Sequence, residues 1–307
     1  MALPYRWQSR VERWKNLLRS FFGAGDQQPR PKLCPACNAL VGVSATRCHE
    51  CGTSLNFSLA ALGKSLSGFV SAEAPVTYVI FVINILLFVV SILASNKLGG
   101  GLNLFGGVSG QVLVQLGAQQ SLMVLSGEWW RLVMPMFLHL GLLHFGMNTM
   151  ALLDFGPRVE STYGSARFLF LYVFTGIAGF VVSAAWQLYW RGGYGLSAGA
   201  STALCGLVGI MLGATLGQQG RQARGTRSEM IRMIGYLVLM GFLFNVDNAG
   251  HAGGLVMGIV FGKLFAERQP MNAKEVKRAY FLGFFSAAVV IASFVMMFIH
   301  LKDFSLN

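Results

Sequence analysis

The chain has 307 residues, of which 54% are hydrophobic and only 12% are charged, and its formal net charge at pH 7 is +12. A typical soluble domain carries about 25% charged residues, so this composition excludes an ordinary soluble enzyme. The apolar residues also gather into runs close to the roughly 20 residues that cross a bilayer. The sequence therefore predicts an all-α polytopic membrane protein whose surface contacts membrane lipid.

Residues 1–30 are not apolar enough to span a membrane and combine aromatic with basic side chains at helical spacing. They lack the apolar core of a cleaved signal peptide. We interpret them as a basic amphipathic helix on the cytoplasmic membrane surface, the alternative being a helix that packs on the protein's own domain. The apolar positions are Trp7, Val11, Trp14, Leu18 and Phe21, and the basic positions are Arg6, Arg10, Arg13 and Arg19.

Residues 31–56 contain "CPACNALVGVSATRCHEC", in which two Cys-x-x-Cys pairs each offer two thiolates to one tetrahedral metal. Four sulfur ligands leave no position for water, so the motif predicts a small ribbon with structural Zn2+ and no catalytic metal. Metal binding would fold a segment too short for a core of its own, followed by a linker at 57–75. A cytosolic protein partner is one use for such a ribbon. The predicted ligands are Cys34, Cys37, Cys48 and Cys51.

Seven apolar runs follow, six of them in residues 76–270 and one in the C-terminal segment 271–307. Each is near the length needed to cross the hydrocarbon core as a helix. The stretch 98–130, rich in Gly and Leu with few charges, separates the first two. The expected spans are about 76–96, 131–153, 166–188, 200–217, 229–245, 249–266 and 280–300.

The basic residues predict the orientation of these spans. If the N-terminus is inside, all but four of the 24 Lys and Arg residues fall in inside segments. Cytoplasmic segments carry the excess of positive charge, so we expect a cytoplasmic N-terminus and an outside C-terminus, in a bacterial inner membrane. Anionic lipid then accounts for the net charge, and no nucleic-acid partner is expected. The four outside residues are Lys97, Arg131, Arg191 and Lys302.

Ser201 and His251 fall at the outer ends of the fourth and sixth spans, at one membrane level. Serines in membrane helices usually bond only the backbone or a neighbouring helix. A histidine within hydrogen-bond reach, however, turns a hydroxyl into a nucleophile. Small residues recur every four positions on both spans, and such stripes allow two helices to approach closely. The stripes are Ser201, Cys205, Gly209, Gly213 and Gly217, and Gly250, Gly254, Gly258 and Gly262.

The second span contains "HLGLLHFGMN", in which His144 and Asn148 lie four residues apart and therefore share one helix face. Imidazole and amide donors aimed at one point suit a developing oxyanion. The alternative is that the pair only joins neighbouring helices.

Several ordered motifs together resemble the rhomboid intramembrane serine proteases over about residues 70–270. The motifs are "GEWWR", "HLGLLHFGMN", "YGSARFLFLYVFTGIAG", "GAST" and "GHAGGLVMG". The resemblance implies a rhomboid-like six-helix bundle plus one C-terminal transmembrane helix. It also implies Ser201 as nucleophile, His251 as general base, and His144 and Asn148 with the Ser201 backbone amide as oxyanion donors. Trp130 and Arg131 would belong to a partly embedded loop.

The implied activity is cleavage of transmembrane-anchored proteins near the outer membrane face by a serine endopeptidase with a Ser-His dyad. The sequence departs from the family pattern at Thr202, where glycine is usual, and at Cys205, where an aromatic residue commonly stacks on the histidine. A non-catalytic rhomboid-like protein that binds clients is the alternative. Asp247, four residues before His251, is expected to cap a helix, the alternative being a third member of the catalytic group.

Overall fold

The computed structural model describes residues 32–33, 40–42, 45–50, 74–97, 107–190, 192–244 and 246–305. The chain divides into two compact units, Met1–Phe69 and Val70–Asn307, and each is described by itself. The predicted amphipathic helix of residues 1–30 lies outside the described residues. So do Cys34, Cys37 and Cys51, three of the four predicted zinc ligands.

In the first unit, β1 (Lys32–Leu33) and β2 (Leu40–Val41) form an antiparallel pair with Leu33 opposite Leu40. Val41 and Cys48 are buried together, and Ala45 packs against them. The two strands directly flank the six-residue stretch 34–39 that carries the first Cys-x-x-Cys pair. The ribbon with its zinc remains a prediction from the sequence.

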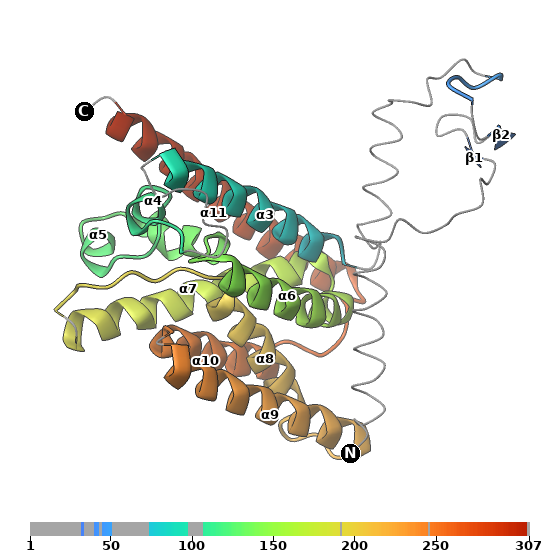
Figure 1. Cartoon of the computed structure of the whole chain (residues 1–307). Helices are drawn as coiled ribbons and strands as arrows, with labels where there is room; N and C mark the ends of the chain where they lie inside the picture. The colour runs from blue at the N-terminus through green and yellow to red at the C-terminus, as the bar shows by residue number, and fades with distance from the viewer. Residues whose placement is uncertain are drawn as a thin grey trace, which may run out of the picture. The chain divides into compact units, whose positions relative to one another are not determined.

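The second unit is a bundle of helices, and each of the seven predicted spans overlaps one of its longer helices (Figure 1). Three of the described helices, Pro75–Ser95, Ser165–Trp190 and Ala273–Leu301, are long and apolar enough to cross a membrane, and α8 is a shorter apolar helix. The helices are α3 (Pro75–Ser95), α6 (Leu142–Tyr163), α7 (Ser165–Trp190), α8 (Ser201–Thr215), α9 (Arg221–Phe244), α10 (Asn248–Leu264) and α11 (Ala273–Ser305).

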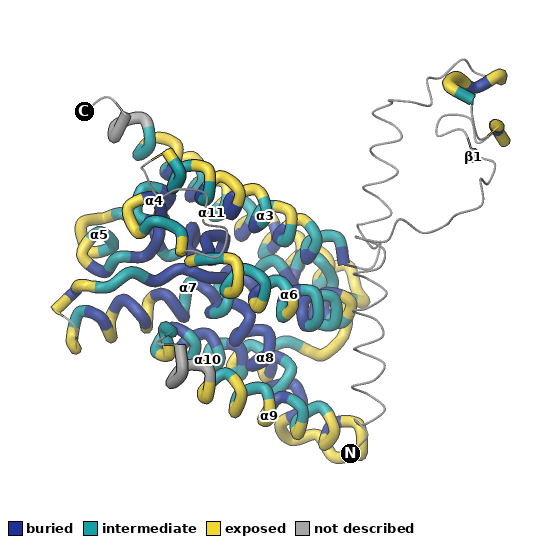
Figure 2. Tube along the Cα trace, viewed as in Figure 1, coloured by how far each residue is buried: buried dark blue, intermediate teal, exposed yellow. Residues whose placement is uncertain are grey.

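Burial follows the pattern of a protein dissolved in lipid rather than in water. Helix α8 is buried along most of its length, whereas the outer faces of α3 and α11 are exposed (Figure 2). Those outer faces carry large apolar side chains, which water would disfavour and hydrocarbon accepts. Among them are Val79, Leu86 and Leu93 of α3, and Phe281, Phe284 and Ile291 of α11.

The start of the second span is the clearest difference from the sequence prediction. The apolar run begins at 131, but α6 begins only at Leu142, because two 3-10 turns, η2 (Trp129–Leu132) and η3 (Met134–Phe137), precede it. Pro135 in η3 has no N–H to donate, so a continuous α-helix through this position would lose one backbone hydrogen bond. The stretch 98–130 also contains two short helices, α4 (Gly110–Gln115) and α5 (Ser121–Leu125).

A buried carboxylate fastens the start of α3 to the end of α6. Glu160, only 1% exposed, accepts hydrogen bonds from the backbone N–H groups of Val76 at 2.9 Å and Thr77 at 2.8 Å. The Thr77 and Ser165 hydroxyls each donate to it at 2.7 Å. The first N–H groups of a helix have no acceptor within the helix and attract negative charge, so this site satisfies both partners.

Helices α8 and α10 cross with their backbones in direct contact, as the spacing of small residues predicts (Figure 1). A Cβ added at Gly258 would collide with the carbonyl oxygen of Gly206, and one at Gly209 with that of Leu255. Only glycine fits at these positions, because the obstructing atoms are backbone that cannot rotate away. The remaining crossing glycines are Gly213, Gly254 and Gly262.

One member of the predicted α8 stripe lies outside this contact. Gly217 follows the last residue of α8, has φ +86° and would meet nothing within 4 Å if it carried a Cβ. Its spacing continues the stripe, but the helix has already ended, so its role is to allow the turn toward α9.

We predict that Gly258→Ala destabilises the protein by about 1–3 kcal/mol, because the added methyl group overpacks a contact between two backbones. The measurement is the free energy of unfolding in detergent micelles. Gly235→Ala in α9 is the control, since a Cβ there meets nothing within 4 Å. Equal stability of the two variants would contradict a glycine-dependent crossing.

Candidate active site

The crossing of α8 and α10 brings the two candidate residues together. Ser201 is the first residue of α8, and His251 lies in the first turn of α10. The Ser201 Oγ and His251 Nε2 atoms are 2.7 Å apart, within hydrogen-bonding distance. The other ring nitrogen of His251, Nδ1, is buried and has no hydrogen-bond partner among the described residues. The arrangement is a serine and histidine pair in which no third side chain of the described residues hydrogen-bonds the ring.

Asp247 is the N-cap of α10, as the sequence predicts. Its Oδ1 atom accepts from the backbone N–H of Gly250 at 2.9 Å. Its Oδ2 atom accepts from the Ser197 hydroxyl at 2.5 Å. Both carboxylate oxygens are therefore engaged away from Nδ1 of His251, so the geometry does not support the alternative of a third member of the catalytic group.

His144 faces the same point as Ser201. The Leu140 N–H donates to Nδ1 of His144 at 3.3 Å, so the neutral ring carries its proton on Nε2. Gly199, with φ +143°, separates the two residues: a Cβ there would lie 2.8 Å from His144 Nε2 and 3.4 Å from Ser201 Oγ. An N–H donor and a hydroxyl thus border one small space that only glycine leaves open.

Asn148 lies one turn after His144 and is 5% exposed. Its amide nitrogen donates to the carbonyl oxygen of His144 at 2.8 Å, while its Oδ1 atom has no hydrogen-bond partner among the described residues. The amide group has two hydrogens, so one donor remains after this bond. His139, fully buried, packs its ring 5.5 Å from that of His144 and limits the ring positions that His144 can take.

Sequence reasoning missed the segment just before Ser201. The Gly199 N–H donates to the carbonyl oxygen of Pro135 at 2.9 Å. Two residues earlier, Ser197 pairs with Gln119 through reciprocal backbone hydrogen bonds of 2.9 and 3.0 Å. The run of small residues in "GLSAGAST" was a signal for close backbone approach, but the partners lie far away in the sequence and no local pattern indicates them.

The two departures from the family pattern are both buried. The Thr202 side chain lies between α7 and α10, where Cβ atoms added at Gly179 and Gly250 would come within 2.9 and 3.0 Å of it. Its hydroxyl has no partner among the described residues, and Cys205 is 2% exposed. Thr202 therefore serves as a small packing group in the helix contact, and Cys205 is a buried side chain of α8.

A buried arginine organises the segment ahead of α6. Arg131 is 0% exposed, and its Nε donates to Glu128 at 2.6 Å. Its Nη1 donates to the carbonyl oxygens of Val114 at 2.7 Å and Ala118 at 3.1 Å, and its Nη2 lies 3.4 Å from Nε2 of His300 in α11. Helix α11 therefore contributes a contact that holds this segment in place.

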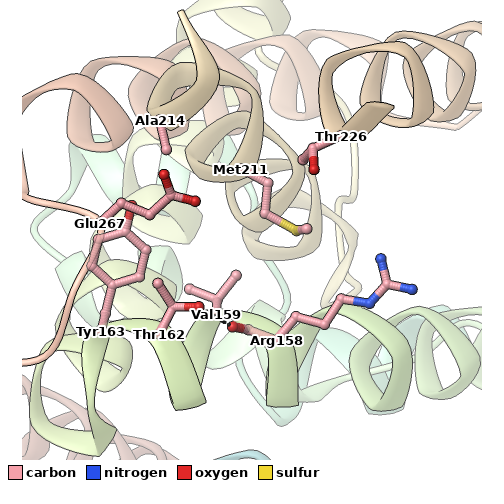
Figure 3. Close-up of a pocket in the computed structure, with 8 residues that line it drawn as sticks. All are labelled: Arg158, Val159, Thr162, Tyr163, Met211, Ala214, Thr226 and Glu267. Atoms are coloured by element: carbon pink, nitrogen blue, oxygen red, sulfur yellow. Dashed lines mark hydrogen bonds between the residues drawn. The ribbon is translucent and has the colours of Figure 1, made fainter. Parts of the chain in front are cut away.

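A cavity of about 100 Å³ lies at the other end of the helices (Figure 3). The Tyr163 ring and the Glu267 carboxylate stand at one side and Arg158 at the other. Ala214 lines it from the last turn of α8, roughly 20 Å from Ser201 along the helix axis. The cavity is therefore separate from the serine and histidine pair.

Comparison with known proteins assigns the family. The family description "Rhomboid domain" matches residues 126–268. The RHOMBOID-like protein 6, mitochondrial, of Arabidopsis thaliana is 30% identical over 223 residues, which cover 66% of this chain and 70% of that protein. The chain belongs to the rhomboid family. Together with the long apolar helices, membership makes this rhomboid an integral membrane protein.

Two bacterial relatives give the same assignment. The Rhomboid protease GluP of Bacillus subtilis (strain 168) is 36% identical over 193 residues, covering 62% of this rhomboid but only 34% of GluP. The Putative rhomboid protease YdcA of the same organism is 32% identical over 147 residues, covering 48% of this rhomboid and 72% of YdcA. The chain thus aligns with about a third of the length of GluP.

We predict that Gly199→Ala slows the labelling of Ser201 by a fluorophosphonate probe at least about tenfold. The added methyl group would occupy the space between His144 and Ser201, and misplacing reacting groups by about 1 Å is costly. Gly127→Ala is the matched control, because Gly127 also has positive φ, +105°, but open space around it. Equal slowing in both variants would assign the effect to backbone strain instead.

Proposed function

We propose that this rhomboid is an intramembrane serine endopeptidase in which Ser201 is the nucleophile and His251 the general base. The observation that carries the proposal is the 2.7 Å approach of Ser201 Oγ and His251 Nε2, at two helix ends beside the Nε2–H group of His144. The relatives named as rhomboid proteases support it. The substrates would be other membrane-anchored proteins.

The mechanism follows from the donors around Ser201. The Ser201 hydroxyl gives its proton to Nε2 of His251 as Oγ attacks a peptide carbonyl carbon. The developing oxyanion takes the space beside Gly199, where His144 and Asn148 donate to it together with the Ser201 N–H. That N–H has no acceptor within α8, since Ser201 is the first helical residue.

Collapse of this intermediate breaks the peptide bond, and His251 returns the proton to the leaving amine. Water then attacks the acyl-enzyme with the same histidine as base. Because a helical peptide bond is shielded by its own hydrogen bonds, the segment to be cut must unwind. Substrates with small or helix-breaking residues near the cut are therefore favoured.

We infer that the Ser201 end of the bundle faces outside. Basic side chains gather at the opposite end, where Arg227 donates to the carbonyl oxygens of Thr215 and Gln218 and Arg167 donates to that of Arg268. Such an excess of arginine is typical of the cytoplasmic side. This orientation puts the N-terminus in the cytoplasm and the C-terminus outside, in a bacterial inner membrane.

Exposed aromatic residues indicate the depth of the site. Trp186, Tyr189, Trp190 and Tyr194 are each at least 46% exposed, as expected for a belt at the membrane interface. Trp190 lies roughly 16 Å along α7 beyond Gly179, the residue that contacts Thr202. Ser201 therefore lies below the interface, and water must enter from the outer face to reach it.

Zinc in the N-terminal unit is a separate part of the proposal. Cys34, Cys37, Cys48 and Cys51 would bind one structural Zn2+, and the pairing of β1 with β2 supports this because it closes the stretch that carries the first two cysteines. The metal would supply folding energy and no catalytic step. A cytosolic partner of the ribbon remains a prediction from the sequence.

We predict that the purified protein cleaves a model single-span substrate and that Ser201→Ala and His251→Ala each abolish cleavage. Product formation in detergent micelles, followed on gels, is the measurement. Equal product from all three proteins would indicate another site or a contaminant. No product from any of them, with correctly folded protein and several substrates, would favour a rhomboid that binds clients without cutting them.

We predict that about one Zn2+ per chain co-purifies and that Cys48→Ser removes most of it, because a thiolate ligand is lost. The metal content is measured by plasma mass spectrometry. Cys205→Ser, at a buried position in α8, is the control and should leave the zinc content unchanged. Equal zinc in both variants would contradict the predicted ligand set.

A further inference from the structure

One contact links the segment before Ser201 to the helix that carries His251. The Ser197 hydroxyl donates to Oδ2 of Asp247 at 2.5 Å. The other oxygen of the same carboxylate caps α10 through the Gly250 N–H at 2.9 Å. The His251 N–H in turn donates to the Asp247 carbonyl oxygen at 3.0 Å. Asp247 therefore caps α10, the helix that carries His251, and is itself held by Ser197, which lies outside that helix.

Ser197 is itself fixed in place. Its backbone exchanges two hydrogen bonds with Gln119, and Ser197 is 5% exposed. The Gln119 side chain is fully buried and bonded to Ser121 at 3.2 Å and to Gln187 of α7 at 3.1 Å. The Ser197 hydroxyl thus projects from a rigid part of the bundle, and the carboxylate that it holds belongs to the start of α10.

His251 needs such a support because, among the described residues, its ring has a hydrogen bond only on the side of Ser201. Nδ1 is buried without a hydrogen-bond partner among the described residues, so no acceptor fixes the ring from behind. The position of Nε2 then depends on where the first turn of α10 stands. Proton transfer slows when the reacting groups are displaced by about 1 Å. The end of a helix that nothing holds can move by this distance.

We propose that Ser197 and Asp247 form a positioning contact: the Ser197 hydroxyl holds the Asp247 carboxylate, which sets the first turn of α10 and so keeps His251 Nε2 against Ser201 Oγ. This inference rests on the proposed function. Neither residue touches the reacting atoms, so both are positioning residues. A carboxylate that only capped α10 would have no need of the second bond to Ser197.

The test is a double-mutant cycle on the purified full chain with Ser197→Ala and Asp247→Ser. A serine at 247 retains an oxygen that can cap α10 but is too short to reach Ser197. We expect Ser197→Ala to lower kcat about tenfold with KM unchanged, because the first turn of α10 is then free to shift and misplaces His251. In the Asp247→Ser background, Ser197→Ala should cause no further loss.

Two additional variants identify the hydroxyl as the cause. Ser197→Thr retains the hydroxyl and should recover most of kcat. Ser126→Ala removes an exposed turn hydroxyl that donates to the carbonyl oxygen of Met123, away from the pair, and should leave kcat unchanged. An unchanged kcat in Ser197→Ala would overturn the proposal. So would an equal loss in both Asp247 backgrounds, because the two residues would then act independently.

Failure of the proposed function is distinguishable from failure of this inference. If the wild type cleaves no substrate, the proposed function fails while labelling of Ser201 by a fluorophosphonate probe still reports on the pair. Slower labelling of Ser197→Ala than of the wild type then supports the positioning contact, and equal labelling overturns it.

Discussion

The backbone contact between α8 and α10 is the constraint on which the site depends. In hydrocarbon, apolar side chains gain nothing by leaving lipid, so two helices associate through close packing and polar contacts. Glycines at the crossing let each helix lie against the carbonyl groups of the other. Because both helices start at the same end of that crossing, their first turns meet, and the side chains there, Ser201 and His251, come within hydrogen-bonding distance.

Around this contact, three charged side chains lie where backbone groups need a partner. Glu160 accepts the free N–H groups at the start of α3, Asp247 does the same for α10, and Arg131 donates to loop carbonyl oxygens ahead of α6. An unpaired charge in such surroundings would cost several kcal/mol, about as much as the stability of a whole domain. The bonds of Glu160 and Asp247 also mark where α3 and α10 begin. The hydrogen bonds that stabilise these charges therefore help to position the site.

Much of this arrangement could be predicted from the sequence because it is periodic or local. The four-residue glycine spacing predicts the crossing, and Asp247 before an apolar helix predicts the cap. The start of α6 could not be predicted from apolarity, because the run continues smoothly through residues that form 3-10 turns at Pro135. The Ser197 to Asp247 bond joins residues 50 positions apart, and no pattern in one sequence encodes such a distance. The zinc ribbon depends on cysteine spacing alone and stays a prediction.

The contact of Arg131 with His300 has a consequence for biogenesis. The two residues are 169 positions apart, and α11 is the last helix of the unit to leave the ribosome. Until it inserts, the Arg131 guanidinium lacks this partner, and Phe137 lacks the Phe294 ring that packs 5.6 Å from it. The segment ahead of α6 therefore reaches its final packing only after α11 has joined the bundle.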